Sequence, residues 1–584
     1  MNEPVFIILY QTSILHDKQH DKGEEYRSDL TPKLKFKKKK AKKMSSLVSI
    51  DITNTARESR TAVTQCVSDL PWTTTARKLD PNANLIWIDR ALPVKKFYLQ
   101  RLGANRRTYQ RANRFFGMDS IVTKCALAKA LEALEALVSN IIRQSSLNVN
   151  SKDDNILSTT TSTSTTTQCM PKSWCLPRDY TLFETLINLN STSWYIAKPD
   201  RGRCGRGIAL FPNPTKLMTA FRTGELSPED DKEPTKSKPS TNNTVDLQTL
   251  NPVIVQEYIA NPLLYRDTGQ KFDLRVYVLI KSLSPLSVYV FEEGLVRVAS
   301  TKYETPTELN CNTATMHLTN SHINSKIQGS GDAITQSESE SDQQSKKQMP
   351  LKHCITDTLQ WISQTYNVPV ADIWTSICQS VATAIVAIYP SASLIHSTCF
   401  APNREEHSNQ CFQLLGVDVI LDNELKPWVL EINNSPSLNL STEADVAIKV
   451  PLIKDMMVKV FGRENGTEGG TDGKEGTDGI DGKDENVNGE RKNVPTFTKL
   501  IVNDTIVDMQ NRMLDLYRKM CGWKPSSCRP VKGIKVSKSI YEKMIKQGIE
   551  LPLLKGLTLN TFMIFMVECD DYNGMMERVE EVLR

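Results

Sequence analysis

The sequence predicts an α+β fold with a central block of strands. Two segments, residues 121–142 and 373–389, repeat apolar side chains at helical spacing. Short apolar runs indicate strands at residues 193–197, 208–211, 252–258, 272–280, 286–292, 412–421 and 428–433. Helices mixed with a central block of strands favour an α+β catalytic region.

The first helix and one central strand show these patterns most clearly. The run Ile121–Ile142 places Leu and Ala on one face and Lys and Glu on the other. In the strand that begins at Lys271 the period is two. Lys271, Asp273 and Arg275 share a face with Tyr277, and Phe, Leu and Val occupy the opposite face. One face therefore belongs to a core, and the other is either solvated or covered by a polyanionic ligand.

Several segments are too polar to fold by themselves, because they bury too little apolar surface to offset their ordering entropy. We expect a largely disordered basic N-terminal segment at 1–75, three disordered insertions at about 150–168, 223–247 and 326–348, and a Gly- and acid-rich linker at 463–493. Residues 495–584 are predicted to be a helical, basic C-terminal region.

Charge and cysteine content exclude several classes of protein. The chain has 584 residues, a net charge of +5 and 13 cysteines without CxxC pairs, which argues against a zinc module or a disulfide scaffold and suits a reducing compartment. Val5–Tyr10 is too short for a signal sequence, and we expect no membrane span. The chain should be soluble and intracellular. Its cationic run at 33–43 fits a solvated tail, docking onto an acidic polymer, a nuclear signal or a nucleic-acid arm.

A glycine- and arginine-rich loop follows the predicted strand at 193–197. It reads KPDRGRCGRGI and begins at Lys198. Glycines let a backbone approach phosphate closely, and successive N–H groups can form an anion-binding nest. The GK[ST] ending of a Walker A motif is missing. The loop is therefore either a phosphate loop or a flexible surface turn.

The run GVDVILDNELKPWVLEINNSP contains two acids within apolar strands. A hairpin centred on residues 424–425 places Asp418 directly across from Glu431, with Asn433 on the same face. Two like charges would repel there, and a divalent cation between them removes that cost. Oxygen ligands of this kind suit Mg²⁺. The alternative is a pair of acids satisfied by hydrogen bonds at a sheet edge.

These motifs together predict ATP bound between strands. Lysines face its phosphates, the glycine-rich loop lies close to them, and the hairpin holds the metal. We find no Ser-His-Asp or Cys-His arrangement in the sequence. An enzyme of this kind acts by positioning and electrostatics.

Six motifs occur along the chain in a recognisable order: KPDRGRCGRGI, VQEYIANPLL, KFDLRVYVL, EEGLVRVAS, MHLTN and GVDVILDNELKPWVLEINNSPSL. Over residues 80–460 the sequence resembles the tubulin tyrosine ligase-like family, and within it most closely the polyglutamylase branch. The resemblance implies an ATP-grasp catalytic domain at 80–460, with nucleotide between two α+β subdomains. It also implies ATP and Mg²⁺ as cofactors.

The resemblance assigns roles residue by residue. Lys198 and Arg275 would be catalytic, Arg275 by stabilising the acyl-phosphate transition state. The nucleotide would be bound by Lys198, Arg206, Gly207, Gln256, Glu257, Tyr258, Ile259, Lys271, Asp273, Thr319 and Asn320. The magnesium ligands would be Asp418, Glu431 and Asn433.

The incoming amino acid would be bound by Arg297, Ser321, His322, Asn434 and Lys449. Ser321 and His322 stand where glutamylating members carry Tyr and Ser, and Asn434 stands where some carry His. The ATP and metal residues therefore match the family's pattern, whereas the residues for the added amino acid depart from it.

The predicted function is a ligase that joins glutamate to glutamate side chains of tubulin tails through an acyl phosphate. Its partners would be tubulin or microtubules and free glutamate, with no nucleic acid. We expect a monomer in the cytoplasm, on the cytoskeleton or at a cilium or basal body. The alternatives are a tubulin glycine ligase, a ligase for a non-tubulin acidic protein and a microtubule-binding pseudoenzyme. Basic residues between Arg518 and Lys538 could grip the acidic microtubule surface.

Overall fold

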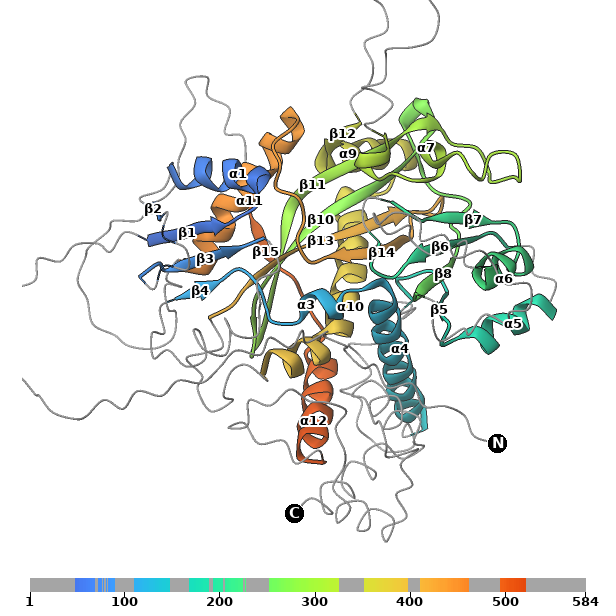
Figure 1. The fold of residues 1–584 in the computed structure, drawn as a ribbon, viewed down its shortest axis with the longest axis horizontal. Helices are drawn as coiled ribbons and strands as arrows, with labels where there is room; N and C mark the ends of the chain where they lie inside the picture. Colours follow the sequence, from blue (N-terminus) through green and yellow to red (C-terminus); the bar gives the residue numbers. More distant parts are fainter. Residues whose placement is uncertain are drawn as a thin grey trace, which may run out of the picture.

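The structure is a computed structural model. It describes residues 48–68, 72–75, 77, 80, 82–89, 110–147, 168–188, 193–202, 205–223, 226, 251–324, 351–397, 410–461 and 494–520. Within these residues, sheets and the helices around them form the α+β fold that the sequence predicts (Figure 1). Apart from residues 168, 223 and 226, the expected disordered insertions and the linker at 463–493 lie outside the described residues, as does the cationic run at 33–43.

A small parallel sheet, with strand order β2-β1-β3-β4, comes first in the described chain. Its elements are β1 (Val48–Asn54), α1 (Arg57–Ser68), β2 (Trp72–Thr75), β3 (Leu85–Ile88) and β4 (Arg111–Ala112). The disorder predicted through residue 75 is therefore wrong for most residues from 48 onward. This segment looks polar by itself, but Ile50 and Val63 are buried in a core shared with helix α11 (Glu443–Phe461).

The central sheet is antiparallel and has the strand order β12-β11-β10-β13-β14, with β9 paired to β10 and β15 to β11. Its strands are β9 (Leu264–Tyr265), β10 (Gln270–Leu283), β11 (Leu286–Lys302), β12 (Lys352–Cys354), β13 (Gln413–Leu421), β14 (Pro427–Asn433) and β15 (Phe497–Lys499), and the 3-10 turn η4 (Arg266–Thr268) joins β9 to β10. Arg275 of β10 opposes Asp418 of β13, which opposes Glu431 of β14. This register brings three charged residues into one row.

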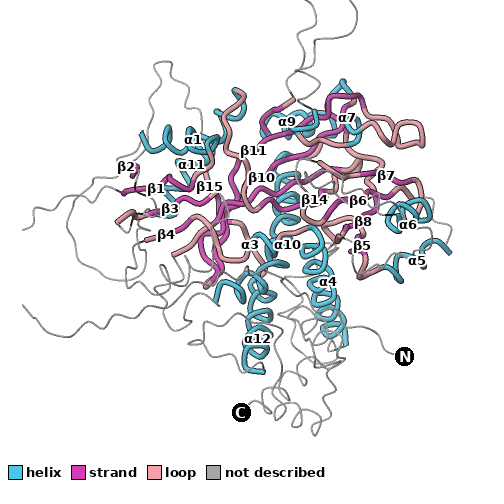
Figure 2. Tube along the Cα trace, viewed as in Figure 1, coloured by secondary structure: helices cyan, strands magenta, loops and turns pink. Residues whose placement is uncertain are grey.

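Helices pack on one face of the central sheet (Figure 2). Helices α4 (Lys124–Leu147), α9 (Ile355–Tyr366) and α10 (Val370–Ser397) contact its strands, and α3 (Met118–Ile121) and α12 (Asp504–Met520) pack against α10. Leu274, Val276 and Val278 of β10 join the main hydrophobic core there. Tyr277 belongs to the opposite face, where it packs in the core shared with α11 and the N-terminal sheet. The two faces predicted for β10 are therefore confirmed.

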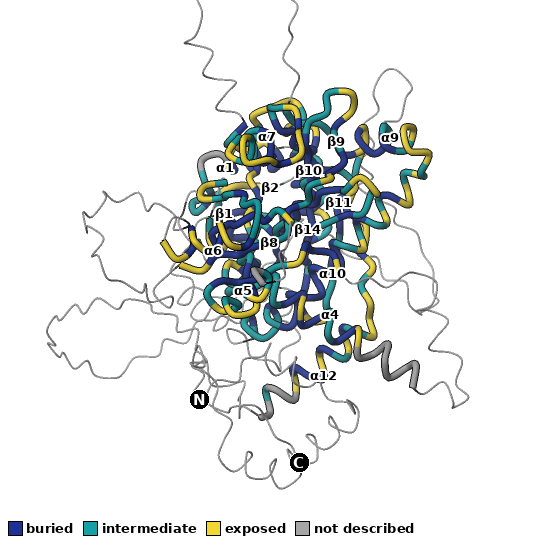
Figure 3. The backbone as a smooth tube through the Cα atoms, turned by 90° about the vertical axis from the view of Figure 1, so that its right-hand side faces the viewer, coloured by how far each residue is buried: buried dark blue, intermediate teal, exposed yellow. Residues whose placement is uncertain are grey.

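Helix α10 is long enough and apolar enough to cross a membrane, judged by length and composition. In the structure, however, 61% of its most apolar stretch is buried inside the protein. Figure 3 colours much of α10 as buried. Packing against the central sheet explains its composition as that of a core helix.

The second antiparallel sheet has the order β5-β8-β6-β7 and forms a smaller α+β unit. Its elements are β5 (Ser173–Leu176), α5 (Tyr180–Asn188), β6 (Tyr195–Pro199), β7 (Ala209–Phe211), α6 (Pro214–Thr223) and β8 (Val253–Glu257). Phe183 of α5 and Phe221 of α6 pack against Tyr195 and Val255 on one face of this sheet. By the period of two, Lys198 and Gln256 point to the other face.

The described part of the C-terminal region is only partly helical. Residues 504–520 form α12, which agrees with the helical expectation, but 497–499 form strand β15 on the edge of the central sheet. Arg518 Nη2 donates a hydrogen bond to Ser397 Oγ at 3.2 Å, so this basic residue contacts α10. Residues 521–584, which hold most of the predicted basic surface, lie outside the described residues.

Replacing Gly294 of β11 with alanine is predicted to destabilise the fold. A Cβ at this position would lie 2.3 Å from the backbone oxygen of Arg275 and 2.6 Å from Ile355 Cδ1. Because the paired backbone cannot move away easily, we expect the free energy of unfolding to fall by about 2 kcal/mol. Urea denaturation measures this loss. Lys302→Ala, at an exposed position on the same strand, is the control, and equal stability of the two variants would contradict the prediction.

Candidate active site

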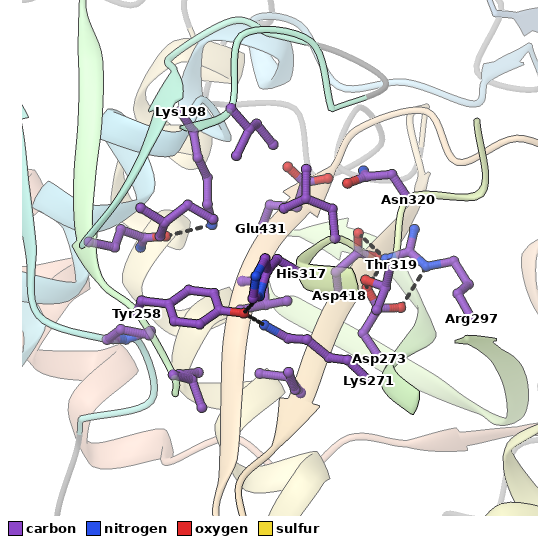
Figure 4. Close-up of a pocket in the computed structure, with 18 of the residues that line it drawn as sticks. Lys198, Tyr258, Lys271, Asp273, Arg297, His317, Thr319, Asn320, Asp418 and Glu431 are labelled. Atoms are coloured by element: carbon purple, nitrogen blue, oxygen red, sulfur yellow. Dashed lines mark hydrogen bonds and ion pairs between the residues drawn. The ribbon is translucent and has the colours of Figure 1, made fainter. Parts of the chain in front are cut away.

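A cleft lies between the second antiparallel sheet (β5-β8-β6-β7) and the central sheet (Figure 4). Strands β6 and β8 line one side, strands β10, β11, β13 and β14 line the other, and the residues at and after α7 (Ala314–His317) complete it. The predicted site residues that line it are Lys198, Gln256, Glu257, Tyr258, Ile259, Lys271, Asp273, Arg297, Thr319, Asn320, Asp418 and Glu431. The fold thus brings most of the predicted nucleotide and metal residues to one place.

Lys198 enters the cleft from the second antiparallel sheet, near the end of β6. Its Nζ donates a hydrogen bond of 2.7 Å to Gln256 Oε1 on the neighbouring strand β8. Gln256 Nε2 in turn donates to Ser173 Oγ at 2.9 Å, which fixes the amide. Burial lowers the pKa of Lys198 to about 8, against the opposing effect of Glu431. The ammonium group is thus held in place in a site that disfavours its charge.

Lys271 enters from the central sheet, at the start of β10. Its Nζ donates a 2.8 Å hydrogen bond to the Tyr258 hydroxyl and lies 4.1 Å from the centre of that ring. Burial, together with the charge of Lys198, lowers the pKa of Lys271 to about 7. The cleft therefore contains two lysine side chains whose pKa values are both lowered. A bound polyanion would reverse that effect.

His317 completes this contact and was not predicted. Its Nε2 lies 3.1 Å from the carbonyl oxygen of Asn310, and its Nδ1 lies 3.1 Å from the Tyr258 hydroxyl. Because a carbonyl oxygen only accepts, Nε2 carries the ring proton and Nδ1 accepts from Tyr258. Burial and the nearby Lys271 lower the pKa of His317, which favours this neutral form. The MHLTN motif contains His317, but the sequence offers no sign of its partners.

Buried ion pairs form the floor of the cleft. Arg297 binds Asp273 through two hydrogen bonds of 2.6 Å, and its Nη2 lies 2.7 Å from Asp418 Oδ2. Arg275 reaches Asp418 from the other side, with Nε 2.5 Å from Oδ1. Thr319 Oγ1 donates to Asp273 Oδ2 at 2.5 Å. Burial raises the pKa of Asp418, but the two arginines outweigh it and lower the pKa to about 2.

These arginines remove the repulsion between two acids from which the sequence predicted a metal ion. Asp418 and Glu431 do lie directly opposite each other, as predicted. The repulsion expected from the hairpin alone does not arise, because the neighbouring strands supply Arg275 and Arg297, which already offset the charge of Asp418. Glu431 is paired more loosely, with Lys124 Nζ 3.5 Å from its Oε2. Lys124 was not predicted, because the helical pattern around it does not show which polar residue would reach the hairpin.

The three predicted magnesium ligands nevertheless converge. Asn433 Nδ2 lies 3.4 Å from Asp418 Oδ2 and 3.3 Å from Glu431 Oε1. A half-turn of this amide presents its oxygen to the same point, which would then be surrounded by three oxygen-bearing side chains. Such ligands suit Mg²⁺, which keeps water and phosphate oxygens in its other positions. The residues therefore fit a magnesium ion, and Glu431 and Asn433 are more available to it than the doubly paired Asp418.

The glycine-rich loop lies against the segment that follows α7. Gly205 and Gly207 have φ values of +75° and +68°, which side chains other than glycine rarely adopt. A Cβ on Gly205 would lie 2.4 Å from Ile323 Cδ1 and 3.2 Å from Asn320 Oδ1. Of the predicted residues here, Asn320 borders the cleft, whereas Arg206 and Gly207 are exposed.

The predicted residues for the incoming amino acid do not all meet in the cleft. Arg297 lines it. Ser321 and the exposed His322 follow directly on Asn320, a cleft residue, in a helical turn at 321–324. The predicted catalytic residue Arg275 is held beside the cleft floor through its contacts with Asp418.

Asn434 and Lys449 do not line the cleft. Asn434 borders a second, smaller hollow beside the N-terminal sheet, and its carbonyl oxygen accepts a 2.8 Å hydrogen bond from Gln413 Nε2. Asn434 directly follows Asn433, the last residue of β14, and neighbouring residues along a strand point to opposite faces. Lys449 is buried in α11, with its Nζ 2.6 Å from Asp445 Oδ1.

Comparison with known proteins now decides the family. Residues 107–467, more than half of the chain, match the family model described as "Tubulin-tyrosine ligase family". The chain belongs to the tubulin-tyrosine ligase family. The motifs of the cleft lie within the matched residues.

Curated relatives of this family are tubulin polyglutamylases by name. The chain is 30% identical to tubulin polyglutamylase ttll6 of Danio rerio over 378 residues, which are 64% of this chain and 38% of that protein. It is 29% identical to tubulin polyglutamylase TTLL13 of Homo sapiens over 432 residues, 73% of this chain and 42% of the relative. It is 28% identical to tubulin polyglutamylase TTLL7 of Xenopus tropicalis over 420 residues, which are 71% of this chain and 37% of that protein. The chain thus spans about two fifths of the length of these relatives.

Replacing Asp418 with asparagine is predicted to destabilise the protein. The substitution leaves Arg275 and Arg297 buried beside a neutral amide, and removing one partner of a buried ion pair costs about 3 kcal/mol. Chemical denaturation at neutral pH measures the change. The control is Glu424→Gln, at an exposed position in the turn of the same hairpin, which should alter stability by less than about 0.5 kcal/mol. An Asp418→Asn protein as stable as the control would show that the ion pairs do not support the fold.

Proposed function

We propose that this chain is an ATP-dependent ligase that adds glutamate to glutamate side chains of tubulin tails. The cleft carries the proposal, because it gathers Lys198 and Lys271 opposite the hairpin acids Asp418 and Glu431, with Asn433 beside them. Membership of the tubulin-tyrosine ligase family and relatives named tubulin polyglutamylases support tubulin as the acceptor. We further propose that it acts as a monomer on the cytoskeleton, with the cilium or basal body as a narrower site.

ATP would bind between the second antiparallel sheet and the central sheet. These two sheets would belong to the two subdomains of an ATP-grasp fold. Lys198 and Lys271 would contact its phosphates, and the loop with Arg206 and Gly207 would cover them. The adenine would pack against the segment 256–259 that ends β8. Glu431 and Asn433, with Asp418, would hold Mg²⁺, which when bound offsets phosphate charge.

The proposed reaction needs no nucleophile from the protein. A side-chain carboxylate of the tubulin tail attacks the terminal phosphorus of ATP, and ADP leaves as an acyl phosphate forms. The amino nitrogen of free glutamate, as the neutral amine, then attacks the acyl carbon. Phosphate leaves as the amide forms and takes up the proton that the nitrogen loses. The protein contributes by orienting both partners and by offsetting the charge that develops on the phosphoryl oxygens.

The residues of the chain have distinct parts in this scheme. Lys198 and Lys271 hold the phosphates. Arg275 uses some of its N–H donors on Asp418, and the others would stabilise the acyl phosphate. The incoming glutamate would be bound by Arg297, Ser321 and His322, with Lys449 and Asn434 contributing from beyond the hairpin.

Labelling of tubulin tests the function. Purified full-length protein with Mg-ATP and radiolabelled glutamate should label tubulin. Glu431→Gln keeps the shape of the side chain but removes a charged metal ligand, so we expect the rate to fall by about 100-fold, or about 2.7 kcal/mol in the barrier. Glu424→Gln, exposed in the same hairpin, is the matched control and should keep the wild-type rate.

Other outcomes of this assay point to other functions. Incorporation of glycine alone would replace glutamate as the donor. Equal labelling of tubulin that lacks its acidic tails would indicate another acceptor site. Microtubule binding without incorporation of any amino acid would mean that the chain is not a ligase, and an unchanged rate in Glu431→Gln would remove Glu431 from the metal site.

ATP binding is predicted to take up protons at mildly alkaline pH. In the free protein the pKa of Lys271 is lowered to about 7 and that of Lys198 to about 8. Both are charged well below these values, so binding there moves no proton. As the pH rises through them the free lysines lose protons, and phosphate restores the charged form; ATP affinity should therefore fall while uptake approaches about one proton or more.

Calorimetry in buffers of different ionisation enthalpy measures this uptake. Lys271→Arg is the control, because a guanidinium keeps its charge throughout this range and should reduce the uptake. ATP binding with no proton uptake across the two pKa values would show that these lysines do not receive the phosphates.

A further inference from the structure

Asp445 is a fully buried carboxylate held between two lysines. It lies in the first turn of α11 and has no exposed surface. Lys449 Nζ lies 2.6 Å from its Oδ1, and Lys352 Nζ lies 2.8 Å from its Oδ2. The cluster formed by Asp445, Lys352 and Lys449 therefore holds one positive charge in excess. Charge that is buried without a counter-charge is unfavourable, so the cluster is suited to an anionic ligand.

The cluster lies next to the arginines of the cleft floor. Lys352 of β12 stands directly opposite Arg297 of β11, so the two side chains share a face of the central sheet. Arg297 lines the cleft. Lys449 is close enough to Arg275 for that guanidinium to lower its pKa. The excess charge of the cluster is thus continuous with the wall of the candidate active site.

Asp445 also organises the loop that leaves the hairpin. Its Oδ2 accepts hydrogen bonds from Ser441 Oγ at 2.9 Å and Thr442 Oγ1 at 2.8 Å, while its own N–H donates to Thr442 Oγ1 at 3.1 Å. Lys449 Nζ donates to the Asn439 carbonyl oxygen at 2.7 Å. Thr442 and Asp445 form the reciprocal cap of a helix N-terminus. Such a cap needs no lysine, so the two ion pairs require a further explanation.

We propose that Asp445 is a positioning residue for the incoming amino acid: it holds Lys352 and Lys449 beside Arg297 and Arg275, so that their excess positive charge receives a carboxylate of that substrate. The inference rests on the proposed ligase function for the identity of the ligand. Asp445 itself would not touch the amino acid. It acts by fixing the place and the charge of the two lysines.

A split between two Michaelis constants tests this role. In the full-length protein, Asp445→Asn keeps the shape of the side chain but removes its charge, and we expect KM for glutamate to rise about tenfold while KM for ATP stays within about twofold. Thr442→Val is the matched control, since it removes the helix cap and leaves the carboxylate. It should lower the melting temperature as Asp445→Asn does, but leave KM for glutamate unchanged.

The protonation of Lys449 gives a second readout that does not depend on activity. The charged groups that face it are Asp445 on its own helix, Lys352 on β12 and Arg275 on β10. Burial lowers its pKa to about 8, and Asp445 opposes that effect. Without the carboxylate the two cations lower the pKa further. The titration of the Lys449 side chain, followed by NMR of ¹³C-labelled lysine and assigned by the signal lost in Lys449→Arg, should therefore lie at a lower pH in Asp445→Asn than in wild-type protein or Thr442→Val.

The outcomes separate this inference from the function on which it rests. Wild-type protein that ligates no amino acid overturns the ligase function. Normal ligation with an unchanged KM for glutamate in Asp445→Asn overturns the role of Asp445 alone. An unchanged titration of the Lys449 side chain in Asp445→Asn also overturns it, whatever the activity.

Discussion

Asp418 is held between two arginines, and the arrangement of the cleft depends on that contact. The register of β10 on β13 places Arg275 opposite it, and β11 brings Arg297, which also binds Asp273. A slip of one residue between these strands would turn the charged side chains into the apolar core, so the ion pairs and the hydrophobic face specify the same register. Because the floor is fixed in this way, Glu431 on the next strand has a defined place.

The arginines and carboxylates at the floor of the cleft nearly balance in charge, whereas the two lysines of the cleft have no carboxylate partner in this balance. Arg275 and Arg297 are matched by buried carboxylates, but Lys198 and Lys271 are held by the neutral partners Gln256 and Tyr258. Their lowered pKa values express the cost of two ammonium groups in a buried cleft. A triphosphate removes this cost, while neutral ligands of the same size do not. The cleft is therefore electrostatically suited to a polyanion, as the proposed function requires.

Local patterns predicted the parts of the fold that local rules decide. Alternation gave β10 its two faces, and the position of the turn placed Asp418 opposite Glu431. The pair Arg275–Asp418 could not be found in this way, because its members are 143 residues apart and strand order is set by tertiary packing. The same holds for residues 48–75, whose polar composition suggests disorder, and for His317, whose partners come from distant segments.

Two adjacent asparagines of the hairpin motif, Asn433 and Asn434, lie in different surroundings. Asn433 ends β14 and turns toward the hairpin acids, whereas Asn434 follows the strand and borders the hollow beside Trp87 and Arg114. The N-terminal sheet thus forms part of the surroundings of the motif, although β1 to β3 precede the residues that match the family. Its packing against α11, the helix that carries Asp445, means that its loss would disturb the part of the site that we propose for the amino acid, while leaving the cleft between the second antiparallel sheet and the central sheet largely in place.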